Sequence, residues 1–127
     1  MIFGIGVDVL DITRIEKLLA RYESRFIDHL LTALEKEQYA DTNQGVHYLA
    51  TRFSGKEAIS KALGTGLRKP MTLHAVSILN DLVGKPELVF DKTLDKFLRS
   101  REVNRIHISF SHEGSLLTSF AVAERLI

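Results

Sequence analysis

The stretch of sequence that decides the fold is FSGKEAISKALG, Phe53 to Gly64, which completes a helical pattern beginning at Val46. Apolar side chains recur there at steps of three and four residues, which places them on one face of a helix: Val46, Leu49, Ala50 and Phe53. Glu57 and Lys61 fall within the same arc, one turn apart. Gly64 is a typical C-terminal glycine. The sequence therefore predicts a long helix that carries two charges on its apolar face.

Spacing alone leaves two interpretations of Glu57 and Lys61 open. They form either an ordinary i,i+4 ion pair on a solvent-exposed helix end, or a functional pair, because charges on an apolar face are costly unless they are paired or used. Four small residues share this part of the helix: Ser54, Gly55, Ala58 and Ala62. They predict that another element approaches the helix closely, which argues against a free surface.

The N-terminal segment, Ile2 to Val9, alternates in the manner of a β-strand. Its apolar side chains share one face, whereas Gly4, Gly6 and Asp8 share the other. Glycines in a strand most often let another element pack closely, and the strand alone favours that interpretation. The alternative is that the glycines clear space for a ligand beside Asp8.

A helix is predicted to follow this strand, beginning at Asp11 or Thr13, with Thr13 and Glu16 at capping-box spacing. Its basic residues recur at steps of three and four and so form a stripe: Arg14, Lys17, Arg21 and Arg25. On a helix of unknown function, such a stripe is most often simply a face exposed to solvent. The functional alternative is a docking face for an acidic partner.

Shorter signals mark the remaining helices and loops. Residues 26–34 are apolar and predicted to be helical, and Thr32 with Glu35 supplies a second capping box that opens a short helix. A loop is expected at residues 41–45 and a further short helix at residues 91–99.

Strands are predicted in the second half of the chain at residues 76–79 and 88–90. A C-terminal hairpin over residues 106–122 is expected to turn at Glu113 and Gly114. Strands and helices without a strict βαβ order indicate an α+β fold, with a small antiparallel-rich sheet and helices packed on it. The length fits a single domain over residues 1–127.

Composition narrows the class of protein. Of the 127 residues 45% are apolar, enough for a core, and the formal net charge of +1 gives no global attraction to nucleic acid or membrane. The lack of cysteine excludes disulfides, thiolate metal sites and cysteine nucleophiles. No signal-like N-terminus and no membrane-length apolar run are found, so a cytoplasmic protein is expected.

Missing motifs exclude several kinds of site. There is no Gly-x-Ser-x-Gly elbow, no Walker A loop and no zinc-ligand spacing among the five histidines. The remaining kind of site is one in which oxygen ligands hold a metal ion. Asp8 and Glu57 are carboxylates on different elements, and Mg²⁺ typically binds one or two protein carboxylates together with water and substrate phosphates. Lys61 suits phosphate charge, so the set favours phosphoryl-type transfer.

Two segments resemble the signatures of the 4′-phosphopantetheinyl transferases. GVDVLDITRIE, residues 6–16, resembles their N-terminal Gly-x-Asp signature, and FSGKEAISKA resembles the second, Phe-x-x-Lys-Glu-Ala-x-x-Lys-Ala. KALGTG at residues 61–66, GKP at 84–86 and ISFSH at 108–112 look like the short bacterial type, the holo-acyl-carrier-protein synthases. The resemblance spans the chain in order. One departure is that residues 41–45 lack the basic residues expected there.

The resemblance implies transfer of the 4′-phosphopantetheine group of coenzyme A to a serine of apo-acyl carrier protein, releasing 3′,5′-ADP and supporting fatty acid biosynthesis. It implies that Asp8 and Glu57 hold Mg²⁺ together with the pyrophosphate of coenzyme A. It also implies that Lys61 contacts the phosphates and helps the ADP to depart. The base near the serine hydroxyl is either a carboxylate or metal-bound water.

A homotrimer with sites between subunits is implied as well, with coenzyme A touching two chains. Contacts to coenzyme A are expected from seven residues: Arg52, Lys61, Gly64, Gly84, Pro86, Ser111 and His112. By the same resemblance, the basic stripe is expected to be the dock for the acidic carrier protein. The small residues of the central helix fit this picture, because a bound cofactor needs room beside Glu57.

Two other functions use the same residues. One is a different small Mg²⁺-dependent phosphotransferase with the same carboxylates. The other is a non-catalytic module that binds the carrier protein through the basic helix. The joint presence of Asp8, Glu57 and Lys61 argues against the second.

Overall fold

The computed structural model, which describes residues 1–126, contains five helices and five strands that follow one another without a βαβ repeat. The elements are, in chain order, β1 (Ile2–Asp11), α1 (Ile12–Tyr22), α2 (Ser24–Leu30), α3 (Ala33–Asp41), α4 (Gly45–Leu63), β2 (Val76–Asn80), β3 (Pro86–Phe90), α5 (Lys92–Ser100), β4 (Arg105–Glu113) and β5 (Leu116–Glu124). The α+β class is confirmed. None of the described helices combines the length and the apolar character needed to cross a membrane.

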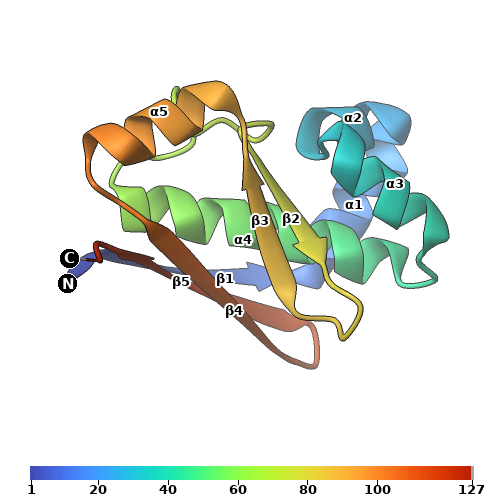
Figure 1. The fold of residues 1–127 in the computed structure, drawn as a ribbon. Coiled ribbons are helices and arrows are strands. Elements are labelled where there is room, and N and C mark those ends of the chain that lie inside the picture. The colour runs from blue at the N-terminus through green and yellow to red at the C-terminus, as the bar shows by residue number, and fades with distance from the viewer. Residues whose placement is uncertain (127) are drawn as a thin grey trace.

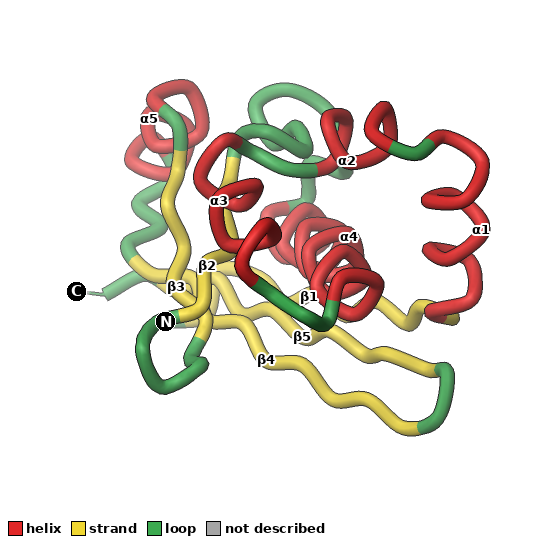
Figure 2. The backbone as a smooth tube through the Cα atoms, turned by 90° about the vertical axis from the view of Figure 1, so that its right-hand side faces the viewer, coloured by secondary structure: helices red, strands yellow, loops and turns green. Residues whose placement is uncertain are grey.

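The strands form two antiparallel sheets around α4. A three-stranded sheet has the order β1-β5-β4, and β2 pairs with β3 in a separate hairpin. In Figure 1 the larger sheet runs along one side of α4 and the β2–β3 hairpin crosses the same helix. Figure 2, turned so that α4 is seen nearly end-on, shows α2 and α3 on the far side of α4 from this sheet, α1 beside α4, and no described helix on the sheet's outer face. The central helix is thus enclosed, while the sheet is covered on one face.

Glycines bring β1 unusually close to α4. A Cβ atom on Gly6 would overlap the carbonyl oxygen of Ala58, and one on Gly4 would overlap the carbonyl oxygen of Ala62. The favoured interpretation of these glycines, close packing by another element, is therefore confirmed.

Close packing also explains the small residues of α4, and it corrects the expectation that they leave room for a cofactor. Ala58 and Ala62 lie against β1, and a Cβ on Gly55 would come within 2.8 Å of Ile78 and 3.1 Å of Phe110. Sheet residues fill the space that these small side chains leave, so any ligand beside Glu57 lies on a different flank of α4.

Two apolar clusters flank the central helix. One joins the C-terminal half of α4 to α5 and the sheets; its buried members include Ile59, Leu63, Val76, Leu94 and Leu98. The other joins the N-terminal half of α4 to α1 and α2; its buried members include Ile15, Phe26, Leu30, Leu49 and Leu117. Burial of an aliphatic or aromatic side chain contributes about 1.5–3 kcal/mol, so α4 is the element on which both halves of the fold depend.

Helix starts follow side-chain caps. Asp11 is the N-cap of α1: its carboxylate accepts hydrogen bonds from Thr13 N at 3.0 Å and from Thr13 Oγ1 at 2.8 Å. Thr13 therefore lies inside the helix, and its expected capping box with Glu16 is wrong. The second capping box, between Thr32 and Glu35, is confirmed with both of its bonds present.

Three boundaries differ from the sequence prediction. Glu23, at φ +50°, separates α1 from α2, so Arg25 lies on α2 and not on the same helix as the other basic residues. The helix predicted to reach residue 34 ends at Leu30, because Thr32 is extended in order to cap α3. In the C-terminal hairpin Glu113 still pairs with Leu116, which moves the turn one residue onward from the expected site.

Gly6→Ala should lower the free energy of unfolding by about 1–3 kcal/mol, the usual cost of overpacking, because its methyl group would meet backbone that cannot rotate away. Urea unfolding measures this loss. Gly45→Ala is the matched control: its Cβ would meet Tyr39 at an ordinary 3.5 Å, so stability should stay constant or rise by up to about 1 kcal/mol. Equal stability of the two variants would contradict the close packing of β1 on α4.

Candidate active site

Asp8 and Lys61 meet where β1 crosses α4. Lys61 Nζ lies 3.5 Å from Asp8 Oδ1 and donates a hydrogen bond to the carbonyl oxygen of Val7 at 2.9 Å. The Asp8 side chain is only 15% exposed, whereas that of Lys61 is 51% exposed. The Lys61 ammonium, which is partly open to solvent, therefore lies beside the largely buried carboxylate of Asp8.

A pair of serines holds the Asp8 carboxylate from the inner side. Ser54 Oγ of α4 donates to Asp8 Oδ2 at 2.8 Å, and Ser119 Oγ donates to Ser54 Oγ at 2.7 Å. The β1–β5 register places Ser119 directly opposite Asp8. Neither serine was predicted as a site residue, since the sequence gives no register and Ser54 is also explained as a small packing residue.

Glu57 lies on α4 one turn before Lys61 and is half-buried. Within residues 1–126 no side-chain hydrogen bond or ion pair engages its carboxylate, and the Lys61 ammonium turns to Asp8 and Val7. The interpretation as an ordinary i,i+4 ion pair is therefore wrong. Two carboxylates from two elements, one of them unengaged, match the donor set of Mg²⁺, which completes its coordination with water and phosphate oxygens.

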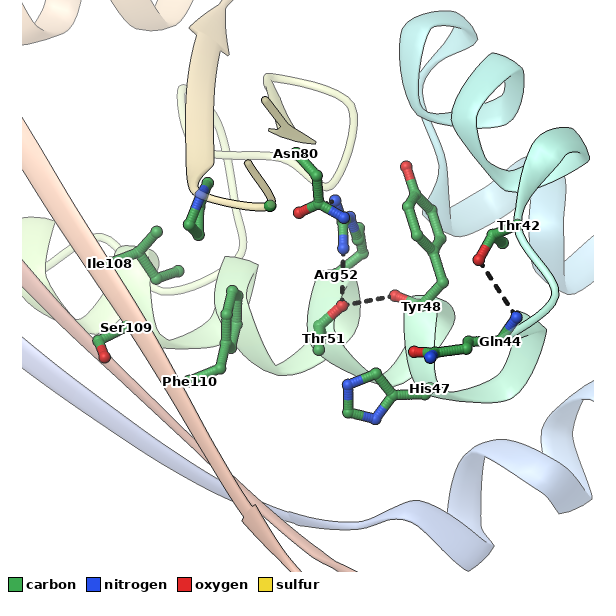
Figure 3. A pocket seen from close by; sticks show the side chains of 12 residues that line it. Thr42, Gln44, His47, Tyr48, Thr51, Arg52, Asn80, Ile108, Ser109 and Phe110 are labelled. Atoms are coloured by element: carbon green, nitrogen blue, oxygen red, sulfur yellow. Dashed lines mark hydrogen bonds between the residues drawn. The ribbon is translucent and has the colours of Figure 1, made fainter. Parts of the chain in front are cut away.

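A second feature is a cavity of about 410 Å³ between α4, the β2–β3 hairpin and β4. Three of the residues expected to contact coenzyme A line it: Arg52, Gly84 and Pro86. Figure 3 shows its lining side chains converging from these elements. Thr42 and Gln44 supply a neutral wall at the loop that lacks the expected basic residues.

Arg52 is a structural part of this cavity's wall. Its guanidinium donates to Ile78 O at 2.8 Å, to Thr51 Oγ1 at 2.9 Å and to Asn80 Oδ1 at 3.2 Å. It also stacks on the Tyr48 ring, 3.7 Å from the ring centre. Burial raises the pKa of Tyr48 to about 12 although the Arg52 charge opposes that shift. A rigid positive wall of this kind suits an anionic ligand.

The other expected contacts lie outside the cavity lining. Gly64 is the left-handed C-cap of α4, at φ +76°, directly after the turn that carries Lys61. Ser111 and His112 are exposed near the end of β4. His112 packs edge-on against His47 of the cavity wall, with ring centres 5.1 Å apart. Within one chain, the carboxylate cluster and the cavity are thus two separate groups.

The basic residues form one exposed face in spite of the helix break. Arg14, Lys17 and Arg21 are exposed on α1, and Arg25 on α2. The guanidiniums of Arg21 and Arg25 both stack on Tyr22, at 5.2 and 5.8 Å from the ring centre, which bridges the break.

An apolar hollow of about 420 Å³ adjoins this basic face. Leu18, Tyr22, Phe26 and Phe53 are among its lining residues. Arg14 lies over the Phe53 ring at 5.3 Å, and Phe53 is one turn before Glu57 on α4. The basic face therefore ends close to the carboxylates.

Comparison with known proteins shows the family. Residues 4–123 match the model of the 4′-phosphopantetheinyl transferase superfamily. The holo-[acyl-carrier-protein] synthase of Nitrosospira multiformis is 39% identical over 98% of this chain and 100% of its own length. The chain belongs to the holo-[acyl-carrier-protein] synthase family.

Solved holo-[acyl-carrier-protein] synthases have the same fold. The Neisseria meningitidis structure is 36% identical, with a TM-score of 0.94, over 98% of this chain and all of that one. The Bacillus anthracis synthase, described in complex with CoA (3′,5′-ADP), is 32% identical, with a TM-score of 0.82, over 99% of both chains. The likeness to synthases thus extends over nearly the whole chain.

The raised pKa of Tyr48 predicts a pH dependence of stability. Because the phenolate is disfavoured in the folded state, the contribution of Tyr48 is complete below its ordinary pKa of 10.0 and is lost as the pH rises through about 12. Between these two pH values the free energy of unfolding of the wild type should fall by about 2–3 kcal/mol more than that of the Tyr48→Phe variant. Urea unfolding from about pH 9 upward measures the difference; parallel curves would contradict the burial of Tyr48 beneath Arg52.

Proposed function

We propose that this chain transfers the 4′-phosphopantetheine group of coenzyme A to a serine hydroxyl of apo-acyl carrier protein, in a Mg²⁺-dependent reaction that releases 3′,5′-ADP. The main support is the contact of Asp8 with Lys61 beside the unengaged Glu57 carboxylate. These are the signature residues of the family to which the chain belongs. A cytoplasmic role in fatty acid biosynthesis accompanies this proposal.

Each residue of the cluster has a distinct task. Asp8 and Glu57 would hold Mg²⁺, which supplies charge neutralisation for the pyrophosphate when it is bound. Ser54 and Ser119 orient the Asp8 carboxylate. The Lys61 ammonium faces the phosphates and stabilises charge on the departing ADP oxygen.

The transfer needs only coenzyme A and the carrier serine as reactants, and each bond that forms is matched by one that breaks. The carrier serine oxygen forms a bond to the phosphorus of the pantetheine phosphate, and the bond from that phosphorus to the bridging pyrophosphate oxygen breaks. The serine proton passes to a carboxylate or to water, and 3′,5′-ADP leaves with the bridging oxygen. Positioning and charge neutralisation dominate such transfers, which is what an Asp–Glu–Lys cluster provides.

Glu57→Gln should lower turnover by at least about 100-fold while leaving the fold intact, because the amide keeps the shape but removes a charged metal ligand. The assay follows the mass increase of apo-acyl carrier protein and the release of 3′,5′-ADP. Near-normal turnover at saturating Mg²⁺ would overturn the assignment of Glu57. A wild type that binds the carrier protein but leaves its mass unchanged would support a non-catalytic module in place of the transferase.

The basic face on α1 and α2 is proposed as the dock for the acidic carrier protein. The cations attract an anionic partner, and the adjoining hollow beside Phe53 offers apolar contact. The position of this face next to Glu57 would bring the carrier serine toward the metal ligands.

Lys17→Glu with Arg21→Glu should raise the KM for carrier protein at least about tenfold, because steering by charge is reversed. The KM for coenzyme A should be nearly constant, and stability should change by only about 0–1 kcal/mol. The matched control is Lys92→Glu with Lys96→Glu on α5, which alters net charge equally on exposed residues elsewhere. If the control pair weakens carrier binding as much, the face has no specific role.

A homotrimer with shared sites is proposed from the outer face of the β1-β5-β4 sheet. Its exposed side chains are largely apolar, including Ile5 at 60%, Val7 at 50%, Val9 at 63% and Phe120 at 44% exposure. Contiguous apolar surface of this kind marks an interaction site. Copies of this chain packed through that face would also let one chain's cavity complete another chain's carboxylate cluster.

Ile5→Glu with Phe120→Glu should convert the trimer to monomers in sedimentation velocity and reduce turnover together with assembly, since charges would be buried in the interface. Leu34→Glu, at a residue of α3 that is 42% exposed, should sediment as the wild type does. A monomeric wild type with full activity would contradict the proposal.

A further inference from the structure

Lys56, the neighbour of Glu57, is among the largest fully buried side chains of the chain. Its ammonium donates three hydrogen bonds, to Glu35 Oε1 at 2.6 Å and to the carbonyl oxygens of Leu30 and Leu73, both at 2.8 Å. A lysine has three donors, so each one has an acceptor. The side chains of Lys56 and Glu35 are both 0% exposed.

Glu35 extends this contact to further segments. Its Oε1 also accepts from Thr32 N at 3.0 Å, and its Oε2 accepts from Ile78 N at 2.8 Å. The ion pair thereby joins α4 to the end of α2, the first turn of α3, the segment before β2, and β2 itself. We call this arrangement the Lys56–Glu35 clasp.

Stability alone does not explain a buried ion pair. Removing two charges from water costs as much as their attraction returns, and an apolar pair of similar volume is often equally stable. Burial lowers the pKa of Lys56, and the adjacent Glu35 charge opposes that shift. The clasp makes six hydrogen bonds of defined geometry, including the one that Glu35 N donates to Thr32 Oγ1. An apolar pair makes no such directional contacts and would not fix the orientation of α4 in the same way.

The clasp and the glycine contact hold α4 on two flanks. Successive residues of an α-helix point about 100° apart. Lys56 thus anchors one flank, Ala58 rests on β1 at another, and Glu57 points between them. Fixing both flanks determines the rotation of α4 about its axis, and with it the directions of Glu57 and Lys61.

We propose that Lys56 is a positioning residue: the Lys56–Glu35 clasp fixes the rotation of α4 so that Glu57 and Lys61 face Asp8 for binding of the metal and coenzyme A. Functional groups need to be held within about 10–20° of their working orientation, which a slipping helix cannot provide. The inference rests on the proposed function, because it assigns Glu57 to the metal.

The test replaces the clasp by neutral side chains of similar shape, in Lys56→Met and in Lys56→Met with Glu35→Gln. The double variant leaves no buried charge unpaired, so it carries the test if the single variant does not fold. Binding of Mn²⁺ in the presence of coenzyme A, without carrier protein, is measured from the electron paramagnetic resonance of free Mn²⁺. The dissociation constant should rise by about tenfold or more, and kcat should fall with it.

Ile59→Ala is the matched control, because Ile59 is fully buried on the same helix but lies in the apolar cluster with α5. It should lower the melting temperature while leaving the Mn²⁺ dissociation constant unchanged. Unchanged Mn²⁺ binding in the folded double variant would overturn the proposal and leave Lys56 a purely structural role. If the wild type itself binds no Mn²⁺ with coenzyme A, the proposed metal site fails instead.

Discussion

The close approach of β1 to α4 is the constraint on which the rest of the structure depends. Gly4 and Gly6 let the strand backbone rest on the carbonyl oxygens of Ala58 and Ala62, where any side chain would overlap. Asp8 follows two residues after Gly6 and so points to the same face. Contact with Ser54 and Lys61 results directly from that placement. The glycines need not touch a ligand in order to build the site, because their contribution is the spacing that brings a strand carboxylate to the helix.

A sheet covered on one face has a second consequence. The helices lie on the α4 side of the β1-β5-β4 sheet (Figure 2), and the apolar outer face is left to solvent within one chain. The cavity at Arg52 and the carboxylate cluster at Asp8 share no lining residue. The proposed trimer would accommodate both features in a shared site, in which a long ligand such as coenzyme A would span two subunits. The same assembly would cover the exposed valines and isoleucine of β1.

Much of the fold is predictable from local signals. The Thr32–Glu35 capping box, the glycine end of α4 and the alternation of β1, β4 and β5 each depend on neighbouring residues. The site is predictable in its residue types, since Asp8, Glu57 and Lys61 stand out by pattern and by family resemblance. Contacts across the chain are not predictable in this way. The Ser119–Ser54–Asp8 chain depends on strand register, and the Lys56–Glu35 clasp joins residues whose charges look unremarkable in sequence. The helix break at Glu23 also has no strong local signal, because glutamate at positive φ is uncommon.

The most direct measurement is a crystal structure of the protein with Mn²⁺ and coenzyme A, in which anomalous scattering locates the metal. One Mn²⁺ site should lie between the carboxylates of Asp8 and Glu57 and be coordinated directly by both, with Lys61 directed at the pyrophosphate. The glycine contact between β1 and α4 should be unchanged by binding. A metal bound by other residues, or by Asp8 without Glu57, would contradict the assignment of this strand–helix junction as the catalytic centre.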